Sequence, residues 1–295
     1  MPELPEVETI RRDLDPHLVG HAVVRLEVRD RRLLSQIDEE RFRRALSGKV
    51  WTALTRKGKY LVARMANGSE LIFHLRMTGQ LVLLKKPPLL GERVQGEGWQ
   101  EIRFPSPPPS PDGRGNNWRM LLEFDHGVGL AFYDQRRFGE VFLRSPKDAW
   151  PGKTALGPDP LNGLSREDFI GMVKDKTTRI KPLLMDQRFL AGVGNIYAQE
   201  ALFRAAIRPS RPGYRITKME AGTLFNALRE TLLSAIEHRG STSRNYRDAF
   251  GESGSAQKLH AVYRRGGQPC LKCRFVLRET RVGGRGTVYC PRCQH

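Results

Sequence analysis

The chain has 295 residues, of which 39% are hydrophobic, and a formal net charge of +18 at pH 7. This length predicts two domains, or one large domain with an appendage. The charge favours a polyanionic partner, above all nucleic acid, over an unusually basic enzyme of general metabolism. No apolar run reaches 18 residues, which excludes a membrane-spanning helix, and the acidic N-terminus excludes a secretory signal peptide.

The first twenty residues predict an amphipathic helix, because apolar residues recur at helical spacing at Leu4, Val7, Ile10 and Leu14. The chain opens MPELPEVETI, which places Pro2, Glu3 and Glu6 at the helix start. Proline and carboxylates are both common there, so position alone gives these residues a structural role.

Residues 22–145 predict a β-sandwich or barrel. Short alternating or β-branched runs, such as AVVRLEV, KYLVARM and VGLAFY, are separated by turn residues. Residues 87–117 interrupt this pattern with a segment rich in proline, glycine and serine. We expect this segment to be an extended loop outside the core.

From about residue 150 the pattern becomes helical. Ser165-Arg-Glu-Asp168 resembles a capping box, and residues 216–240 carry a leucine stripe that ends at Gly240. Two helical patterns meet at Gly192-Val-Gly-Asn195, where backbone amides would hold a phosphate or glycines would permit close packing. Residues 241–262 are polar and predict a long loop.

The four cysteines form two pairs near the C-terminus, Cys270-x-x-Cys273 and Cys290-x-x-Cys293. This spacing predicts a structural zinc site with four thiolate ligands and disfavours disulfides. Between the pairs, FVLRETRVGGRGTVY predicts two short strands, from Phe275 onward and up to Tyr289, joined by a glycine turn. Arg285 stands at the tip, either solvated or directed at a phosphate.

Seven motifs occur in a fixed order: PELPEVET at the N-terminus, RKGKYL, HLRMTGQL, DQRRFGEV, LGPDPL, MDQRFLAGVGNIYAQEALF and the four-cysteine finger with GRGT. Together they closely resemble the formamidopyrimidine-DNA glycosylase family, whose members are bifunctional base-excision enzymes for oxidised purines. The resemblance runs from residue 2 to residue 294, apart from 87–117 and part of 241–262.

The resemblance implies a multidomain α+β fold. We expect a catalytic N-terminal β-sandwich with flanking helices over residues 1–150, and a helix-two-turns-helix domain with a lesion-capping loop over 151–262. A zinc finger hairpin over 263–295 would hold one structural Zn²⁺. The expected partner is double-stranded DNA containing oxidised purines or abasic sites, bound by a monomer in the cytoplasm at the nucleoid and not at a membrane.

The resemblance makes Pro2 the nucleophile. If Met1 is removed, Pro2 offers a terminal amine, and an α-amino group titrates near ~7.7 against ~10.4 for lysine. A larger fraction of the amine is therefore uncharged and reactive at neutral pH. The resemblance implies a Schiff base on Pro2 followed by β- and then δ-elimination, with Glu3 as the acid/base partner and Glu6 near the lesion pocket.

Further residues receive roles by the same resemblance. The phosphates flanking the lesion would be held by Lys57, His74, Asn195 and Arg285, of which Lys57 and Arg285 count as catalytic. The space left by the flipped base would be filled by Met77, Arg136 and Phe138, with Arg137 on a phosphate. On pattern alone, the sequence favours strand core for Met77 and Phe138.

Two alternatives remain open. An oxidised-pyrimidine glycosylase of the same superfamily shares the N-terminal proline and the finger, although Leu4 and the Arg136-Arg137-Phe138 triplet favour the purine branch. A non-catalytic protein that binds damaged DNA needs no free N-terminal amine.

Overall fold

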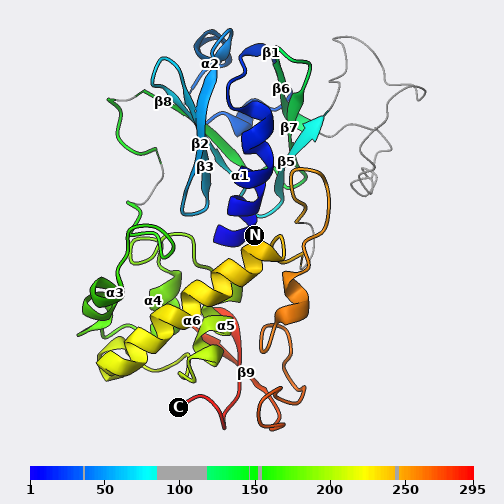
Figure 1. Cartoon of the computed structure of the whole chain (residues 1–295). Helices are drawn as coiled ribbons and strands as arrows, with labels where there is room; N and C mark the ends of the chain where they lie inside the picture. The colour runs from blue at the N-terminus through cyan, green and yellow to red at the C-terminus, as the bar shows by residue number, and fades with distance from the viewer. Residues whose placement is uncertain (36, 85–117, 146, 152–154, 243–245) are drawn as a thin grey trace. The chain divides into compact units, whose positions relative to one another are not determined.

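The computed structural model describes residues 1–35, 37–84, 118–145, 147–151, 155–242 and 246–295 (Figure 1). The chain divides into two compact units. The first comprises residues 1–2, 6–151 and 241–254, and the second residues 3–5, 152–240 and 255–295. The predicted 87–117 loop lies outside the described residues. Within the described parts, no helix combines the length and the apolar character needed to cross a bilayer.

The first unit contains a sandwich of two four-stranded antiparallel sheets, as predicted (Figure 1). One sheet has the order β1 (Val23–Val28), β6 (Trp118–Phe124), β7 (Gly129–Asp134) and β5 (Gly79–Leu84). The other has the order β2 (Trp51–Lys57), β3 (Tyr60–Met65), β4 (Glu70–His74) and β8 (Glu140–Arg144). Alternation along each strand sends one set of side chains into the space between the sheets.

Helices α1 (Leu4–Leu18) and α2 (Glu39–Leu46) flank this sandwich. The apolar stripe of α1, represented by Val7 and Leu14, is buried in one cluster with Phe73 of the second sheet and Phe132 of the first. Burial of each such side chain contributes about 1.5–3 kcal/mol, which fixes α1 against both sheets.

The second unit is built around helices α3 (Arg166–Val173), α4 (Ile180–Met185), α5 (Asn195–Arg204) and α6 (Lys218–Glu237). Ser165 caps α3 as predicted, since its hydroxyl accepts from the Asp168 amide at 3.0 Å. Helix α6 begins with a full capping box formed by Thr217 and Glu220, a T-x-x-E signal that our sequence analysis overlooked. Short 3-10 helices occur at η1 (Arg31–Leu33) in the first unit, and η2 (Gly213–Arg215) and η3 (Ala256–Leu259) in the second.

The C-terminal hairpin pairs β9 (Arg278–Val282) with β10 (Arg285–Tyr289). Gly283 and Gly284 form the turn with φ values of 59° and 72°, a conformation that L side chains rarely adopt. The hairpin was predicted, but the first strand begins at Arg278 instead of Phe275, because the backbone of Phe275 and Leu277 bonds to the cysteine loop, at Cys270 and Gln268, and not to β10.

Candidate functional site

Glu3 is buried at the start of helix α5. Its carboxylate accepts hydrogen bonds from the backbone N–H groups of Ile196 at 3.0 Å and Tyr197 at 3.4 Å. These amides have no partner within their own helix, and the helix dipole favours a negative charge beside them. We predicted Glu3 in the first turn of the N-terminal helix; that was wrong, because α1 begins at Leu4 and Glu3 caps α5 instead.

The Gly192-x-Gly194 pair makes room for this contact. The N–H of Leu4 donates to the Gly192 carbonyl at 3.0 Å. A Cβ atom on Gly194 would lie 2.3 Å from the Glu3 carboxyl carbon, and one on Gly192 would lie 2.8 Å from Leu4 Cβ. The sequence left two explanations for these glycines, phosphate binding by backbone amides and close packing. Close packing explains them, because the Glu3 carboxylate already occupies the Ile196 and Tyr197 amides that a phosphate would need.

Pro2 and Glu6 both belong to the first unit and are buried. With Met1 attached, the Pro2 nitrogen is a peptide nitrogen. The Glu6 carboxylate accepts a hydrogen bond from the Ser241 N–H at 2.8 Å. The backbone carbonyl of Glu6 accepts a second one from the Tyr246 hydroxyl at 3.4 Å. Burial, together with nearby carboxylates led by Glu6, raises the pKa of Tyr246 well above its usual value. Glu6 thereby joins Ser241 and Tyr246 to α1.

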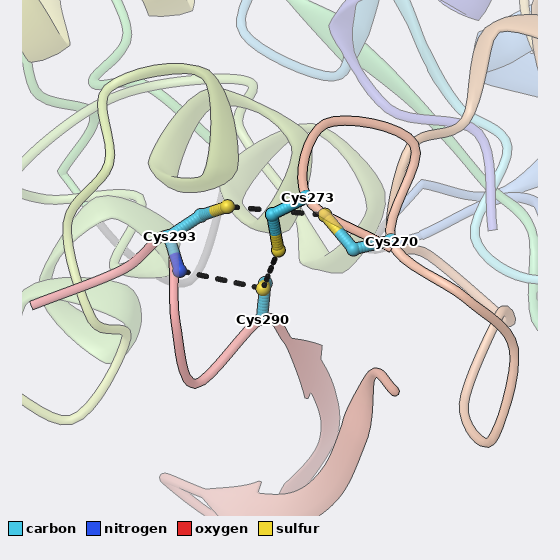
Figure 2. A group of neighbouring side chains, drawn as sticks. All are labelled: Cys270, Cys273, Cys290 and Cys293. Carbon is cyan, nitrogen blue, oxygen red and sulfur yellow. Dashed lines mark hydrogen bonds between the residues drawn. The ribbon is translucent and has the colours of Figure 1, made fainter. Parts of the chain in front are cut away.

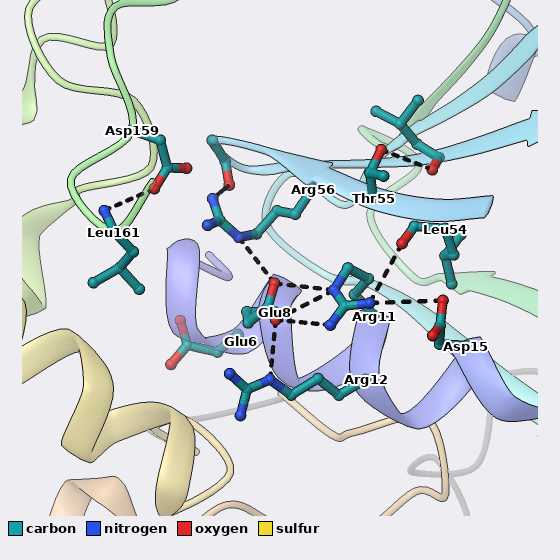
Figure 3. Close-up of polar contacts among 12 residues, drawn as sticks. Glu6, Glu8, Arg11, Arg12, Asp15, Leu54, Thr55, Arg56, Asp159 and Leu161 are labelled. Carbon is teal, nitrogen blue, oxygen red and sulfur yellow. Dashed lines mark hydrogen bonds and ion pairs between the residues drawn. The ribbon is translucent and has the colours of Figure 1, made fainter. Parts of the chain in front are cut away.

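Lys57 follows Arg56 in the chain, and Arg56 forms a partly buried ion pair with Glu8 (Figure 3). Arg56 places Nε 3.3 Å from Glu8 Oε2 and donates from Nη1 to the Gly58 carbonyl at 3.1 Å. Burial alone would raise the pKa of Glu8, but the hydrogen bond from Arg11 and the other arginines lower it. Lys57 itself is exposed, with Nζ 4.5 Å from the ring centre of Trp150. Sequence reasoning missed this support, because a basic turn carries no sign of a distant partner.

His74 is buried at the end of β4, with 6% of its surface exposed. Its Nδ1 atom has no hydrogen-bond partner among the described residues. Burial, followed by the charges of Arg76 and Lys59, lowers the pKa of His74 to about 3. The imidazole is therefore neutral at physiological pH, and any phosphate contact would be a hydrogen bond from its ring N–H instead of an ion pair.

Met77 and Phe138 lie in turns, between β4 and β5 and between β7 and β8. They are 45% and 50% exposed, which excludes the strand-core alternative. The Arg136 guanidinium carbon lies 4.9 Å from the Phe138 ring centre. Arg137 has a φ of 58° and places Nε 3.6 Å from a carboxylate oxygen of Asp30, a pair with which a phosphate would compete.

In the second unit, Arg285 opens β10 with an exposed side chain that forms no ion pair with any described residue. Lys181 of α4 is fully buried behind the hairpin. Its Nζ donates to the Thr287 hydroxyl at 2.6 Å and to the Gly286 carbonyl at 3.1 Å. Burial, followed by the charge of Arg285, lowers the pKa of Lys181 to about 8. Sequence reasoning missed Lys181; its only signal is a lysine within the apolar stretch IKPLLM.

Helix α5 holds the same hairpin through Gln199. Its Oε1 accepts from the Val288 N–H at 2.6 Å, and its Nε2 donates to the Asn195 carbonyl at 2.8 Å. The Oδ1 atom of Asn195 is buried without a partner among the described residues. The Asn195 side-chain amide thus keeps unused hydrogen-bonding capacity at the start of α5.

The four cysteines lie together at the base of the hairpin (Figure 2). The Sγ atoms of Cys270 and Cys293 are 3.9 Å apart, and those of Cys273 and Cys290 are 3.5 Å apart. Four thiolates about 2.3 Å from Zn²⁺ define a tetrahedron with edges of roughly 3.8 Å, which fits this set. Both distances exceed the roughly 2.05 Å of a disulfide. The structural zinc prediction is confirmed, and four sulfurs leave no coordination position for water.

Comparison with known proteins matches three stretches of the chain to family models. Residues 1–141 match the formamidopyrimidine-DNA glycosylase N-terminal domain, residues 156–247 its H2TH domain, and residues 267–295 the zinc finger found in FPG and IleRS. The formamidopyrimidine-DNA glycosylase of Solibacter usitatus is 40% identical over all of this chain and 99% of its own length.

Solved structures agree. MutM (Fpg) from Thermus thermophilus matches with a TM-score of 0.80 and 37% identity, covering 99% of this chain and 98% of that one. Lactococcus lactis Fpg has been solved with DNA containing Fapy-dG, an abasic site or an oxidised pyrimidine. These complexes match at 30% identity with TM-scores of 0.82–0.83, covering at least 99% of both chains. The chain therefore belongs to the formamidopyrimidine-DNA glycosylase family of base-excision-repair enzymes.

Proposed function

We propose that this protein removes oxidised purines, including 8-oxoguanine and formamidopyrimidines, from duplex DNA and then cuts the strand at the abasic site. Family membership, the +18 charge and the relatives' complexes with Fapy-dG and abasic-site DNA support this. It would act as a monomer at the nucleoid in the cytoplasm. We take residues 1–150 as the catalytic domain, 151–262 as the helix-two-turns-helix domain and 263–295 as the finger.

The chemistry would begin at Pro2 once Met1 has been removed. The uncharged nitrogen attacks C1′ of the damaged nucleotide, and the electron pair of the glycosidic bond leaves with the base. The Glu3 carboxylate accepts the proton that the Pro2 nitrogen loses after the attack and passes it to the ring oxygen, so that the sugar opens to an iminium on Pro2. Loss of the C2′ proton expels the 3′ phosphate, and loss of the C4′ proton then expels the 5′ phosphate. Water hydrolyses the remaining imine and frees Pro2.

The observation that supports this mechanism best is the anchoring of Glu3 on the Ile196 and Tyr197 amides. Consecutive Cα atoms are about 3.8 Å apart, so a fixed Glu3 restricts the reach of the Pro2 nitrogen joined to it. A nucleophile and its proton partner held in this way lose little entropy at the transition state. A helix start alone would need neither a buried Glu3 nor two glycines that admit it.

The remaining residues would prepare the DNA. Glycosylases extrude the damaged nucleotide, and clamped flanking phosphates favour that extrusion. In the first unit the phosphate contacts would come from Lys57, His74 and Arg137, and in the second from Asn195 and Arg285. Glu6 would lie near the extruded lesion. Met77 and Phe138 would wedge into the emptied stack, and the Arg136 fork would bond the acceptors of the orphaned cytosine.

Borohydride trapping tests this proposal. Wild-type protein, with Met1 removal checked by intact mass, should form a covalent adduct with 8-oxoguanine:C duplex, and Glu3→Gln should convert it far more slowly. No wild-type adduct would instead favour a non-catalytic damage-binding protein. If Pro2→Gly traps as well as wild type, Pro2 is not the nucleophile. Faster cleavage of thymine glycol than of 8-oxoguanine would favour the oxidised-pyrimidine branch.

A further inference from the structure

The three side chains proposed to fill the space of the extruded base lie on two neighbouring turns of the first unit. Met77 belongs to the turn between β4 and β5, and Arg136 and Phe138 belong to the turn between β7 and β8. Both turns cross from one sheet to the other. The last residue of β4 pairs with the first of β8, and the first residue of β5 pairs with the last of β7, so the two turns begin and end side by side.

A single buried carboxylate joins the two turns. Asp134, the last residue of β7, is 1% exposed. Its Oδ1 atom accepts hydrogen bonds from the Thr78 hydroxyl at 2.5 Å and the Arg136 N–H at 3.2 Å, and its Oδ2 atom accepts one from the Gly139 N–H at 2.5 Å. An aspartate that only closed its own turn would need the amide two positions on. The contact with Thr78 spans 56 positions and ties one turn to the other.

Two further contacts hold the same arrangement. Gly139 lets the carboxylate approach, because a Cβ atom there would lie 2.7 Å from the Phe132 ring and 3.0 Å from Asp134 Oδ2. At the opposite end of the turns, the Arg76 Nε donates to a Glu140 carboxylate oxygen at 2.8 Å. The two turns are therefore joined at both ends.

The backbone of each turn is held in an unfavourable conformation beside a side chain that it presents. Arg76 and Arg137 have φ values of 50° and 58°, in the left-handed region that favours glycine. Such values persist in other residues only where the surrounding contacts enforce them. Arg76 adjoins Met77 and Arg137 adjoins Phe138, so the enforced backbone lies directly before each exposed side chain.

We propose that Asp134 and Thr78 hold the three side chains as one preassembled wedge. The wedge consists of Met77, Arg136 and Phe138. The inference rests on the proposed function, because it concerns how these side chains enter the DNA. Turns that are ordered before DNA binds lose little further conformational entropy on insertion, so the wedge enters as a unit. Asp134 and Thr78 act through the wedge and are positioning residues.

Thr78→Val and Thr78→Ser form the decisive pair of variants, because valine keeps the size of the side chain without its hydroxyl and serine keeps the hydroxyl. Single-turnover excision of 8-oxoguanine should fall about tenfold in Thr78→Val and stay within about twofold of wild type in Thr78→Ser. Thr52→Val is the matched control, because it removes an exposed hydroxyl that donates to the Arg64 carbonyl in the same unit. Thermal unfolding followed by tryptophan emission verifies that each variant is folded. All four tryptophans precede residue 152, so their emission reports on the first unit.

A duplex with 2-aminopurine beside a tetrahydrofuran abasic site reports insertion of the wedge without any cleavage. Saturating wild type or Thr78→Ser should change the 2-aminopurine emission, because an inserted side chain disturbs the stacking of the neighbouring base. Thr78→Val should produce less than about half of that change. An emission change without excision of 8-oxoguanine by wild type would contradict the proposed function and still support the wedge.

The double variant Met77→Ala/Phe138→Ala separates positioning from folding. If Thr78 acts through the wedge, adding Thr78→Val to this variant should lower excision by less than about twofold, since the side chains that it positions are already gone. A general loss of stability would lower excision equally in both backgrounds. The proposal is overturned by equal losses in both backgrounds, by a Thr78→Val protein that matches wild type in emission, or by a wild type that leaves the emission unchanged.

Discussion

The Nζ atom of Lys181 lies 2.6 Å from the hydroxyl oxygen of Thr287, and this contact joins helix α4 to the finger hairpin. A fully buried ammonium group is costly unless its protons are bonded, and here both acceptors belong to the strand that begins with Arg285. The lowered pKa of Lys181, about 8, reflects that burial. We infer that Lys181 positions the hairpin tip, while Arg285 meets the DNA.

Replacing Lys181 by Met should therefore impair DNA cleavage more than it impairs folding. The loss of a hydrogen bond from a charged group costs about 1.5–3 kcal/mol, which corresponds to a fall of roughly ten- to a hundredfold in kcat/KM if the bond orients Arg285. Lys174→Met removes the same charge from an exposed position and should leave cleavage unchanged. Equal activities of the two variants in single-turnover assays would contradict a positioning role for Lys181.

Gly194→Ala should uncouple Glu3 from α5. The new Cβ atom would fall 2.3 Å from the Glu3 carboxyl carbon, so the carboxylate must leave the Ile196 and Tyr197 amides. We expect at least a tenfold loss of borohydride-trapped product. Gly171→Ala is the control, since its Cβ meets no atom within 4 Å and alanine favours the helix by about 1 kcal/mol. A Gly194→Ala protein that traps as fast as the control would show that Glu3 needs no anchor.

Met77→Ala and Phe138→Ala should lower excision without lowering stability. Both side chains are about half exposed, so truncation forms no cavity of the kind that destabilises cores. Their proposed role is to fill the space left by the extruded base, which makes nucleotide flipping the step that suffers. Val24→Ala, at a site 52% exposed in the same unit, should match wild type in both stability and single-turnover excision. A large fall in melting temperature for either variant would show that the side chain contributes to core packing, which contradicts the proposed role.

Local sequence patterns predicted the elements whose stability arises from local spacing. The sandwich strands follow from apolar residues that recur every second position, and the buried stripe of α1 follows from a period of 3.6 residues. The four-cysteine hairpin follows from the two C-x-x-C pairs. The contact of Glu3 with Ile196 spans 193 positions, and no local pattern records it. For Gly192-x-Gly194 the sequence indicated either phosphate binding or close packing. The buried Glu3 carboxylate beside these glycines decides for close packing.

The same limit applies to the charged residues. The sequence pattern gives no sign that Arg56 and Glu8 meet, yet the Arg56 side chain is only 2% exposed and forms a partly buried pair with Glu8 across 48 positions. Lys181 reads as a solvated cation within an apolar helix. Burial of an ion depends on which distant oxygen atoms surround it, and the order of residues along one helix does not determine that.

Removal of zinc should unfold the finger and leave the first unit intact. Structural zinc binding supplies about 10–16 kcal/mol of apparent folding free energy in zinc-finger peptides at neutral pH, far more than the small apolar cluster around Cys270 and Cys290 can replace. Cys273→Ser or prolonged chelation should therefore weaken binding to lesion duplex at least tenfold, because Arg285 loses its support. Tryptophan emission should not change, and adding Zn²⁺ back should restore binding to the chelated protein. If binding to lesion duplex is undiminished after zinc loss has been verified, DNA binding does not depend on the zinc-supported hairpin.

His74 should make the first unit sensitive to acid. Its pKa is about 3 in the folded protein, against an ordinary 6.5, because burial and then the charges of Arg76 and Lys59 oppose protonation. Below pH 6.5 the unfolded chain binds a proton that the folded chain rejects, so stability present above pH 6.5 is lost as the pH falls toward 3. Between pH 7 and pH 5 this loss is about 2 kcal/mol.

His74→Phe removes that titration and keeps a ring beside Tyr60, whose centre lies 4.4 Å away in the wild-type protein. Urea unfolding followed by tryptophan emission should therefore show a smaller loss of stability between pH 7 and pH 5 in His74→Phe than in wild type. His17→Phe changes an exposed histidine of the same unit and should keep the wild-type slope. The comparison of slopes is independent of any stability lost to repacking, because repacking changes the free energy of unfolding by the same amount at pH 7 and at pH 5. Parallel slopes for all three proteins would mean that His74 is protonated without cost, and a phosphate contact through a charged imidazolium would then be open again.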